Sequence, residues 1–560
     1  MNLADKYILG ISCGYHDSAA SLLLNGKVLS AVEEERFTGI KHDYSYPTHS
    51  IKWTLDKNGI SEKDISYICF YEDSSDKIDR VKKTSSLLSN KTQKTRKYYK
   101  ELFDTIRKQF GPDVILVEGN HHLSHIAYSY YTSPFNEAVI LSVDGVGEWE
   151  TTSIAVASKN KIKKVKSINY PHSLGLLYST ITAFLGFEPN EGEYKVMGLA
   201  PYGDYTRFDE QFRELYTRDW GSYELNMKYF EFHKSDKVMF NSDMMKLFGI
   251  TNRLPEEEVK QEHKDLAASL QHHYEYLLFS LLDYIQEEMG GSNLCLSGGC
   301  AYNGTANGKI KSKTKFDKLW IPPAPSDAGS AIGACLHFYY SQMDVKHRVQ
   351  NVNPFLGPSY TNDDMLDAIS NHIESVGFSR LDDDVLIEKV SKLIKEGSVV
   401  GWFEGELEFG ARALGHRSIL ANPTMLNMRD RVNKVIKKRE GFRPFAPMVT
   451  YDSQTKYFDY EEDVPYMNQV VQVNEKYQKS LPAITHIDGS ARIQTVRENN
   501  KRIYKLLKQF EIHSGFPILL NTSFNLKGQT MVNDPNTAIE TYLNCEMDYL
   551  VLGNYLLTKI

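Results

Sequence analysis

YILGISCGYHDSAASLLLNGKVLSAVEEE, residues 7–35, is a run of short apolar segments separated by polar ones. ILGIS predicts a first strand, GYHDS a polar loop, AASLLLN a second strand and KVLSAVEE a third. Asn25 and Gly26 lie between the last two strands and form a dipeptide typical of a tight hairpin turn. The chain is therefore expected to open with a strand, a polar loop and a β-hairpin.

The same plan returns in EAVILSVDGVGEWETTSIAVASKNKIKKVKSI, residues 137–168. VILSV predicts a strand, DGVGEWETT an acidic, glycine-rich loop, SIAVAS a strand, and KNKIKKVKSI a turn and a further strand. Two copies with similar loop chemistry favour a duplicated α/β unit over two unrelated hairpins. The duplicated, ribonuclease-H-like fold of the actin-like and sugar-kinase ATPases opens each half in this way, and those proteins bind nucleotide between the halves.

The chain is long enough for more than one domain. A length of 560 residues exceeds what a single hydrophobic core normally supports. The stretch 345–362 contains two prolines and little periodicity. Beyond it, DDMLDAISNH and DDVLIEKVSKLIKEG predict amphipathic helices and SVVGWFEG predicts a strand. We therefore expect one domain at 1–350 and another at 360–560.

Charge and cysteine content exclude several classes of protein. The net charge of −7 argues against a nucleic-acid partner, because such proteins usually carry a basic excess. Six cysteines without a CxxC pair favour reduced thiols over a disulfide framework. No apolar run approaches the roughly 20 residues that span a bilayer, and MNLADKYILG lacks the layout of a signal peptide. We expect a cytoplasmic protein with no membrane partner.

A basic stretch, residues 74–110, separates the two repeated units. It is rich in Lys, Ser and Thr and predicts a polar loop that leads into a surface helix. A charge run of this kind is more often a solvated face than a binding site.

The sequence HHLSH predicts part of a metal site. On a helix, His121 and His125 share one face, one turn apart, whereas His122 points away from them. Asp144 follows the strand VILSV, and Asp327 lies where a proline-rich loop enters a small-residue helix. Two His and two Asp suit iron, manganese or zinc. By pattern alone, core histidines and an N-cap aspartate are an equally good interpretation.

Two glycine-containing loops predict ligand contacts. LCLSGGCAYNGTANGKI, residues 294–310, predicts a strand, a turn at Gly298 and Gly299, and a helix N-terminus that favours anionic groups. The alternative is a tight strand–helix turn. GEYKVMGLAPYG contains Lys195 and is expected to form a polar rim for substrate.

The C-terminal third predicts a phosphate-binding pocket. Guanidinium groups bind phosphate bidentately, and lysine adds a point charge. Hydroxyl and amide groups that follow a strand supply further hydrogen bonds. A basic helix face in water is the alternative, and it suits the lysines better than arginines interleaved with Gly, Ala and Leu. The residues concerned are Arg412, Arg417, Lys437, Arg443, Asn521, Ser523 and Asn525.

Taken together, the motifs resemble the NodU/CmcH-type O-carbamoyltransferases, which include tobramycin carbamoyltransferase. The resemblance extends from about residue 8 to the C-terminus. It rests on GYHDSAASLL, EEERFTGIKHD, HHLSHIAYSYYTSPF, VDGVGE, SLGLLYSTITAFLGF, YKVMGLAPYG, LSGGCAYNGTANGKI, PAPSDAGSAIGA, GARALGHRSILANP, IKKREGFRPFAP, HIDGSARIQTV and NTSFNLKGQ.

The resemblance implies a fold class and a two-step reaction. It implies an α/β chain with an N-terminal actin-like (ribonuclease-H-like) domain and a C-terminal YrdC-like domain. The C-terminal domain would make carbamoyl-adenylate from ATP and carbamoyl phosphate. The N-terminal domain would transfer the carbamoyl group to a hydroxyl of a sugar or natural product, as in antibiotic biosynthesis.

The resemblance also implies roles for individual residues. It implies an iron-like divalent metal, Fe²⁺, on His121, His125, Asp144 and Asp327. It implies that Gly298, Gly299 and Asn303 contact the nucleotide. It also implies that the C-terminal arginines, lysine and amides named above bind carbamoyl phosphate and the nucleotide phosphates. It implies catalytic roles for His16, Lys41 and Lys195, with His16 as general base on the acceptor hydroxyl.

Three positions depart from the usual family motifs, namely His416, Tyr194 and Tyr302. We interpret them as tuning of the pockets. Two rival functions stay open at this point: a small-molecule kinase with the actin-like fold, which would release ADP, and a non-catalytic nucleotide-binding regulatory protein. The acceptor is not encoded in a readable motif, and the oligomeric state, a homodimer included, is equally open.

Overall fold

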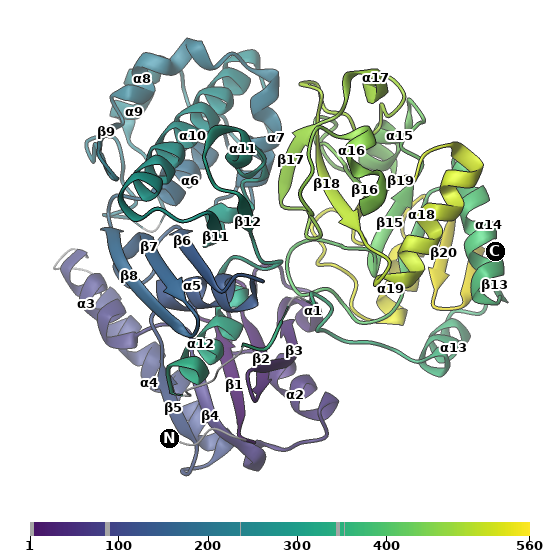
Figure 1. Ribbon diagram of the computed structural model, residues 1–560, viewed down its shortest axis with the longest axis horizontal. Helices are drawn as coiled ribbons and strands as arrows, with labels where there is room; N and C mark the ends of the chain where they lie inside the picture. Colours follow the sequence, from purple (N-terminus) through teal and green to yellow (C-terminus); the bar gives the residue numbers. More distant parts are fainter. Residues whose placement is uncertain (1–4, 85–89, 236, 343–347, 352) are drawn as a thin grey trace. The chain divides into compact units, whose positions relative to one another are not determined.

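The computed structural model describes residues 5–84, 90–235, 237–342, 348–351 and 353–560 (Figure 1). Residues 85–89 of the predicted polar loop, and residues 345–347 and 352 of the predicted domain transition, lie outside this described part. The chain divides into two units. The first comprises Met1–Ala31, Tyr44–Asn303 and Lys309–Val352, and the second Val32–Asp43, Gly304–Gly308 and Asn353–Ile560.

The first sheet arises from the opening sequence. Its strand order is β3-β2-β1-β4-β5, with β1 antiparallel to β2 and parallel to β4. Asn25 and Gly26 both have positive φ at the turn between β2 and β3, as predicted. The strands are β1 (Tyr7–Ser12), β2 (Ala19–Leu24), β3 (Lys27–Glu33), β4 (Ile65–Phe70) and β5 (Ile115–Glu118).

The second sheet repeats this topology. Its order is β12-β11-β6-β7-β8, in which three antiparallel neighbours are followed by two parallel strands, as in the first sheet. The strands are β6 (Glu137–Val143), β7 (Glu150–Ser158), β8 (Lys161–Asn169), β11 (Asn293–Ser297) and β12 (Lys318–Trp320). The matching order confirms the duplicated α/β unit of the actin-like fold.

Two helices join the two sheets of the first unit. Helix α5 (His121–Thr132) packs on β6, β7 and β11, and helix α12 (Asp327–Gln342) packs on β1, β2 and β4. The two helices also pack on each other (Figure 1). A Cβ atom at Gly333 would collide with the backbone oxygen of Ser124, and one at Gly329 with the ring of Tyr128. The small-residue start of α12 therefore permits a close helix pair.

The other elements of the first unit lie outside this centre. Before α5 come α2 (Thr48–Lys57), α3 (Ser74–Thr84) and α4 (Lys91–Phe110). After β8 come α6 (Leu174–Phe184), α7 (Glu193–Leu199), α8 (Asp209–Arg213), a hairpin of β9 (Tyr216–Asp219) and β10 (Ser222–Leu225), α9 (Ser242–Phe248) and α10 (Gln261–Met289). Helix α11 (Gly304–Lys313) is divided, since its residues Gly304–Gly308 belong to the second unit. None of the described helices combines the length and apolar character needed to cross a membrane.

The second unit is built on a nine-stranded mixed sheet of order β13-β21-β20-β14-β15-β19-β16-β18-β17. Its strands are β13 (Val376–Arg380), β14 (Val400–Phe403), β15 (Arg417–Ala421), β16 (Ala446–Thr450), β17 (Gln469–Gln472), β18 (Ser490–Val496), β19 (Ile518–Ser523), β20 (Tyr549–Leu552) and β21 (Tyr555–Lys559). This sheet confirms the α/β class, and the predicted strand in SVVGWFEG is β14.

Helices enclose two apolar cores of the second unit. Helices α14 (Asp383–Lys395) and α18 (Lys501–Ser514) contribute Leu386 and Phe510 to a core around Trp402. Helices α13 (Asn362–Asn371) and α19 (Pro535–Leu543) contribute Ile369 and Ile539 to the other core. The two helices predicted after residue 360 are α13 and α14. Shorter helices are α1 (Glu35–Thr38), α15 (Met428–Asp430), α16 (Gln454–Tyr457) and α17 (Glu475–Gln478).

Arg417 joins the segments at one end of this sheet. Its side chain is fully buried and its guanidinium lies 3.7 Å from the centre of the Phe403 ring. Its nitrogens donate to backbone carbonyls at 2.5–3.4 Å, namely those of Pro358, Glu404, Gly405, His416 and Asn533. These contacts are structural, because they hold loops from distant parts of the chain together.

We predict that Arg417→Met destabilises the full-length protein by about 3 kcal/mol or more, because it leaves several buried carbonyls without donors. Urea unfolding followed by circular dichroism measures the change. Arg497→Met is the matched control, since that side chain is 48% exposed and its ion-pair partner among the described residues is Asp463 at the surface. Equal midpoints for the two variants would contradict the structural role.

Candidate metal centre and phosphate-binding cluster

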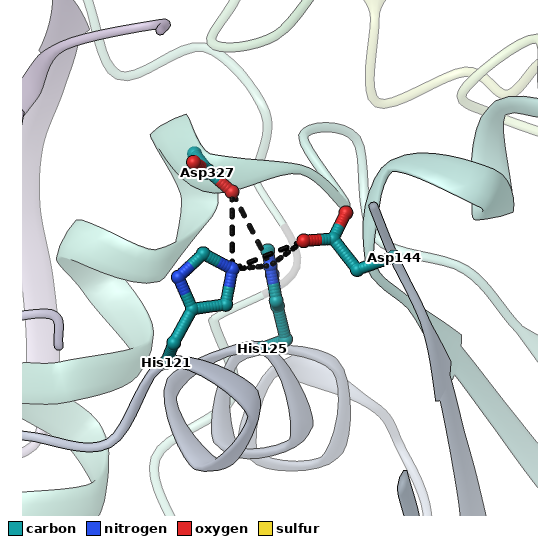
Figure 2. Close-up of side chains that lie close together, drawn as sticks. All are labelled: His121, His125, Asp144 and Asp327. Atoms are coloured by element: carbon teal, nitrogen blue, oxygen red, sulfur yellow. Dashed lines mark hydrogen bonds and ion pairs between the residues drawn. The ribbon is translucent and has the colours of Figure 1, made fainter. Parts of the chain in front are cut away.

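Helix α5 carries two of the four predicted metal ligands. The side chain of Asn120 caps it by accepting a hydrogen bond from the Leu123 amide at 3.0 Å, which fixes where the helix begins. His121 and His125 then share one face, and their Nε2 atoms lie 3.1 Å apart (Figure 2). The helical spacing predicted for this pair is confirmed.

Two aspartates from other elements complete the cluster. Asp144 follows β6, and Asp327 is the first residue of α12. Asp144 Oδ2 lies 3.0 Å from His121 Nε2 and 3.7 Å from His125 Nε2. Asp327 Oδ1 lies 3.4 Å from each of those nitrogens. The structure thus brings together, within 4.8 Å, one ligand atom from each of the four residues.

The chemistry of the cluster fits a divalent cation. All four side chains are buried, and neither carboxylate oxygen of Asp327 has a hydrogen-bond partner among the described residues. Two buried carboxylates that lie this close need a compensating positive charge. The separations of 3.0–3.7 Å between ligand atoms suit ligands that each lie about 2.0–2.2 Å from one metal. Two imidazoles and two carboxylates accommodate iron, manganese or zinc.

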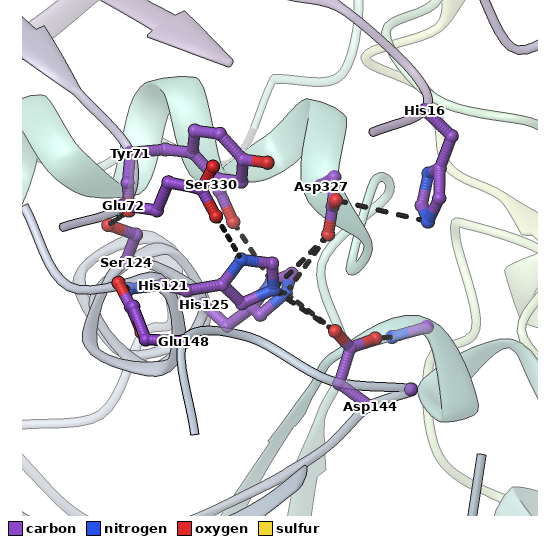
Figure 3. Close-up of polar contacts among 12 residues, drawn as sticks. His16, Tyr71, Glu72, His121, Ser124, His125, Asp144, Glu148, Asp327 and Ser330 are labelled. Atoms are coloured by element: carbon purple, nitrogen blue, oxygen red, sulfur yellow. Dashed lines mark hydrogen bonds and ion pairs between the residues drawn. The ribbon is translucent and has the colours of Figure 1, made fainter. Parts of the chain in front are cut away.

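The outer nitrogens of both imidazoles have polar neighbours (Figure 3). Ser330 Oγ, on α12, lies 3.0 Å from His125 Nδ1. Glu72 Oε2, just after β4, lies 3.8 Å from His121 Nδ1. Such partners orient the rings of metal-binding histidines. The sequence analysis did not identify either residue, although an acidic residue directly after a buried strand is a usable signal for Glu72.

Glu148 positions the start of α5. Its Oε1 atom accepts from the His121 amide at 2.8 Å and from the Asp73 amide at 2.7 Å, and its Oε2 atom accepts from the Asn120 side chain at 3.1 Å. A carboxylate at a helix N-terminus is also favoured by the helix dipole. Glu148 is the last residue of the motif VDGVGE. Its role was not predicted from the sequence, although its place in that motif could have marked it as a candidate.

His16 lies beside the cluster. Its Nε2 atom is 3.8 Å from Asp327 Oδ2, and its Nδ1 atom is 3.0 Å from Asp17 Oδ2. Burial alone would lower the pKa of His16, but the carboxylates of Asp327 and Asp17 outweigh it and raise this pKa to about 9. The imidazole is therefore protonated at neutral pH while those carboxylates carry their full charge. Its expected role as a general base stays a prediction.

His122 packs in the core. It is fully buried, and neither ring nitrogen has a hydrogen-bond partner among the described residues. Burial lowers its pKa well below the usual value, which keeps the ring neutral. Of the three histidines in HHLSH, this one therefore points away from the carboxylates, as predicted.

The glycine loop lies directly against the candidate centre. The Gly299 amide donates to Asp144 Oδ1 at 2.8 Å. Gly298 has a φ of 82°, and a Cβ atom there would collide with the Val143 backbone oxygen. The Asn303 side chain exchanges two hydrogen bonds with Gln271 at 3.0 and 3.1 Å. These contacts position the loop, and its expected nucleotide contacts stay a prediction.

The predicted catalytic lysines lie in different units. Lys195 is on α7, where its ammonium lies 5.8 Å from the centre of the Phe187 ring. Lys41 belongs to the segment Val32–Asp43 of the second unit. There it is close enough to Lys437 to lower the pKa of that ammonium.

Lys437 is the centre of a cationic cluster in the second unit. It is buried, and its Nζ donates to Ser523 O at 2.8 Å, Ser523 Oγ at 3.2 Å and Asn525 Oδ1 at 2.7 Å. Burial lowers its pKa well below the usual value, and the charges of Arg439, Arg443 and Lys41 lower it further. The structure thus assembles Lys437, Ser523 and Asn525, which the sequence analysis assigned to one pocket.

The other residues predicted for this pocket have mixed surroundings. Arg443 donates to Glu440 at 3.4 Å, and Arg412 is half-buried in the loop before β15. The Asn521 amide donates to Ala413 O and to Gln494 Oε1 at 2.9 and 2.8 Å. Arg417 is held by backbone carbonyls, as described above. The phosphate-binding roles of these four residues stay predictions.

Part of the basic stretch 74–110 is not the solvated face that was expected. Lys77 Nζ donates to the buried Glu72 carboxylate at 3.0 Å. Arg80 is half-buried, with its guanidinium carbon 5.2 Å from the centre of the Tyr170 ring. The expectation was wrong for these two residues, because helix periodicity turns them inward while their neighbours face solvent.

Two family models match successive parts of this chain. The family model described as carbamoyltransferase N-terminus matches residues 7–336, and the model described as carbamoyltransferase C-terminus matches residues 391–559. An uncharacterised protein of Synechocystis sp. is 40% identical, over 99% of this chain and 97% of its own length. Nodulation protein NolNO of Sinorhizobium fredii is 36% identical, over 97% of this chain and 79% of its own length.

The chain therefore belongs to the carbamoyltransferase family and is an enzyme of that family. Among solved structures, the HypF protein of T. kodakarensis is 12% identical with a TM-score of 0.33, covering 61% of this chain and 49% of that one. We draw no functional conclusion from that structural likeness.

We predict that His125→Ala loses bound metal. The affinity of the variant for Co²⁺ should fall by more than roughly 10–100-fold, which is the loss expected when only a hydrogen-bond partner of a metal ligand is removed. Equilibrium dialysis with metal analysis measures this. His122→Leu is the control on the same helix, since its ring lies outside the cluster. Unchanged binding in His125→Ala would remove this residue from the ligand set.

Metal binding is also expected to release protons. Burial alone would lower the pKa of His121, but the carboxylates of Asp327 and Asp144 outweigh it and raise this pKa well above the usual value. The pKa of His125 is raised as well, for the same reason. A ligating imidazole must be neutral, so binding displaces these protons and affinity rises with pH.

Calorimetric titration of Co²⁺ near pH 7 in two buffers of different ionisation enthalpy measures the number of protons released. We expect at least one per metal bound. Equal heats in both buffers would show that the imidazoles are already neutral in the metal-free protein.

Proposed function

We propose that this carbamoyltransferase makes carbamoyl-adenylate from ATP and carbamoyl phosphate and transfers the carbamoyl group to a hydroxyl of a sugar or natural product. One observation carries the proposal: the cationic cluster around Lys437. The ammonium is buried, is held by neutral oxygens, and lies within the field of three further cations. Such a site is costly without an anion, and phosphate groups of the two proposed substrates supply it.

In the proposed first step, water hydrolyses carbamoyl phosphate to carbamate and inorganic phosphate, and a carbamate oxygen then attacks the α-phosphorus of ATP. The bond between the α-phosphorus and the oxygen that bridges it to the β-phosphorus breaks, and pyrophosphate departs with the electron pair. Lys437 and Arg443 would bind the anionic oxygens, while Ser523 and Asn525 hold the Lys437 ammonium in place. The positive charges would stabilise the negative charge that builds up on the phosphates during this displacement.

In the proposed second step, an oxygen of the acceptor hydroxyl attacks the carbamoyl carbon. The bond from that carbon to the adenylate oxygen breaks, and AMP leaves with the electron pair. The hydroxyl proton passes to His16, which Asp17 orients through its 3.0 Å contact. A divalent cation on the four cluster residues, which suit ferrous iron, would polarise the phosphate and offset the charges that raise the pKa of His16.

A small-molecule kinase is the second candidate, because both sheets of the first unit have the strand order of actin-like ATPases. It would transfer the γ-phosphoryl group to the acceptor and release ADP. The Lys437 cluster would then have no substrate, which is why we favour the adenylate route.

The deciding measurement is pyrophosphate release from ATP by the Fe²⁺-loaded protein. We predict release that depends on carbamoyl phosphate and falls at least 100-fold in Lys437→Met, since a charged contact to the reacting phosphates is lost. His16→Gln should retain release but lose transfer to the acceptor. ADP in place of pyrophosphate would favour the kinase.

Lys434→Met is the matched control for Lys437→Met. It lies one turn away, is 62% exposed and, within the described part of the chain, forms its ion pair with Asp430. It should release pyrophosphate at the rate of the unmodified protein. An equal loss in both variants would mean that the effect of Lys437→Met is structural and would argue against the proposed phosphate site.

A further inference from the structure

Helix α3 places a basic stripe against aromatic rings of the first unit. Three of its four basic residues, Lys77, Arg80 and Lys83, occur at intervals of three, so they lie on one side of the helix. Each cation lies 5.2–5.7 Å from a ring centre, in the pairs Lys77 with Tyr15, Arg80 with Tyr170 and Lys83 with Trp149.

This stripe lies beside the candidate centre. Tyr15 precedes His16, and their ring centres are 4.6 Å apart. Lys77 Nζ lies 3.0 Å from Glu72 Oε2, which is in turn 3.8 Å from His121 Nδ1 (Figure 3 shows Glu72, His121 and His16 around the cluster). A series of contacts therefore runs from His16, the proposed base of the transfer step, through Tyr15, Lys77 and Glu72 to His121, a candidate metal ligand.

Arg80 differs from its neighbours on the stripe, because it forms no ion pair with a carboxylate in the described part of the chain. Lys77 is paired with Glu72, and Lys83 with Asp79 at 2.7 Å. The Arg80 guanidinium makes no hydrogen bond or ion pair with any described residue, and its Nε atom is buried. A guanidinium keeps its charge when buried, so an unpaired one is costly unless an anion binds it.

The surroundings of Arg80 indicate where that anion would lie. The charge of Arg80 interacts with Glu72 and with the hydroxyl groups of Tyr15 and Tyr170, so it is close to the contacts just described. Its guanidinium carbon lies 5.2 Å from the centre of the Tyr170 ring, and a guanidinium beside an aromatic face can still donate two parallel hydrogen bonds to a carboxylate. Tyr15 is 44% exposed and offers an apolar ring next to His16.

We propose that Arg80 binds a carboxylate of the acceptor, and that the acceptor is an acidic sugar whose ring lies on Tyr15. This inference rests on the proposed carbamoyl transfer and names the class of its acceptor. A sugar ring stacks on an exposed tyrosine while its carboxylate meets a guanidinium fork. Glu72 and Asp327 make the surroundings of His16 and His121 anionic, so an acidic acceptor needs a cation there to bind at all.

The first test measures binding directly on the full-length protein. The probes are two matched pairs, glucuronate with glucose and N-acetylmuramate with N-acetylglucosamine. Calorimetry or saturation-transfer NMR should show at least one acidic sugar binding about 10-fold or more tightly than its neutral counterpart. Arg80→Gln should abolish that preference, and Arg80→Lys should keep part of it.

Lys83→Gln is the matched control. Lys83 lies one turn further along α3, is 63% exposed and has its own partner in Asp79. It should keep the preference for the acidic sugar. An unmodified protein without preference in either pair, or an equal loss in Arg80→Gln and Lys83→Gln, would overturn the proposal. A melting temperature of Arg80→Gln close to that of the unmodified protein excludes misfolding as the cause.

The second test separates this proposal from the proposed function. Pyrophosphate release and the KM for ATP are measured in the same proteins. If Arg80→Gln loses binding of the acidic sugar but keeps pyrophosphate release and the KM for ATP, the acceptor subsite is supported. A raised KM for ATP or carbamoyl phosphate with unchanged sugar binding would assign Arg80 to a substrate phosphate and refute the subsite. Acidic-sugar binding without any pyrophosphate release would refute the carbamoyl-adenylate route while leaving the subsite intact.

Discussion

The close packing of α5 on α12 is the constraint on which the candidate centre depends. Glycines at 329 and 333 remove the Cβ atoms that would hold the two helices apart. Because the helices approach, two imidazoles on one meet a carboxylate at the start of the other. Asp144, at the end of a strand in the second sheet, completes the cluster. A larger residue at Gly333 would separate ligands that come from opposite halves of the duplicated unit, without any change to the ligands themselves.

The buried charged clusters of the two units favour ligands of opposite sign. In the first unit, buried carboxylates surround imidazoles and raise the pKa of His16 and His121, so the centre attracts cations and holds protons. In the second unit, burial and neighbouring cations lower the pKa of Lys437, so that cluster attracts anions. Both arrangements gather buried charged groups, whose cost depends on the partners they find. The ligands that we propose have the opposite sign in each case, a divalent cation in the first unit and phosphate groups in the second.

Much of the fold was predictable because it depends on local patterns. Alternating apolar and polar residues indicated the strands, Asn25 and Gly26 the hairpin turn, and helical spacing the His121–His125 pair. The repeated strand order is confirmed in both sheets. Other features could not be predicted. Glu72 and Glu148 act through contacts with His121 across 49 and 27 positions of the chain, and although local patterns could mark both residues as candidates, they do not identify His121 as the partner. Arg80 could not be singled out either, because it belongs to a run of charged residues whose pattern is the same as that of a solvent-exposed helix.

By itself, the sequence determined the α/β class, the duplicated strand plan and the motifs of a carbamoyltransferase, because strand periodicity, turn chemistry and residue type are properties of short segments. Only the tertiary structure decided which charged groups are paired and which are not. Arg417 proved to be held by backbone carbonyls, Lys437 by neutral side-chain and backbone oxygens, and Arg80 by an aromatic ring alone. The physical reason is that the cost of a buried charge depends on its neighbours in space, and these neighbours come from segments far apart in the sequence.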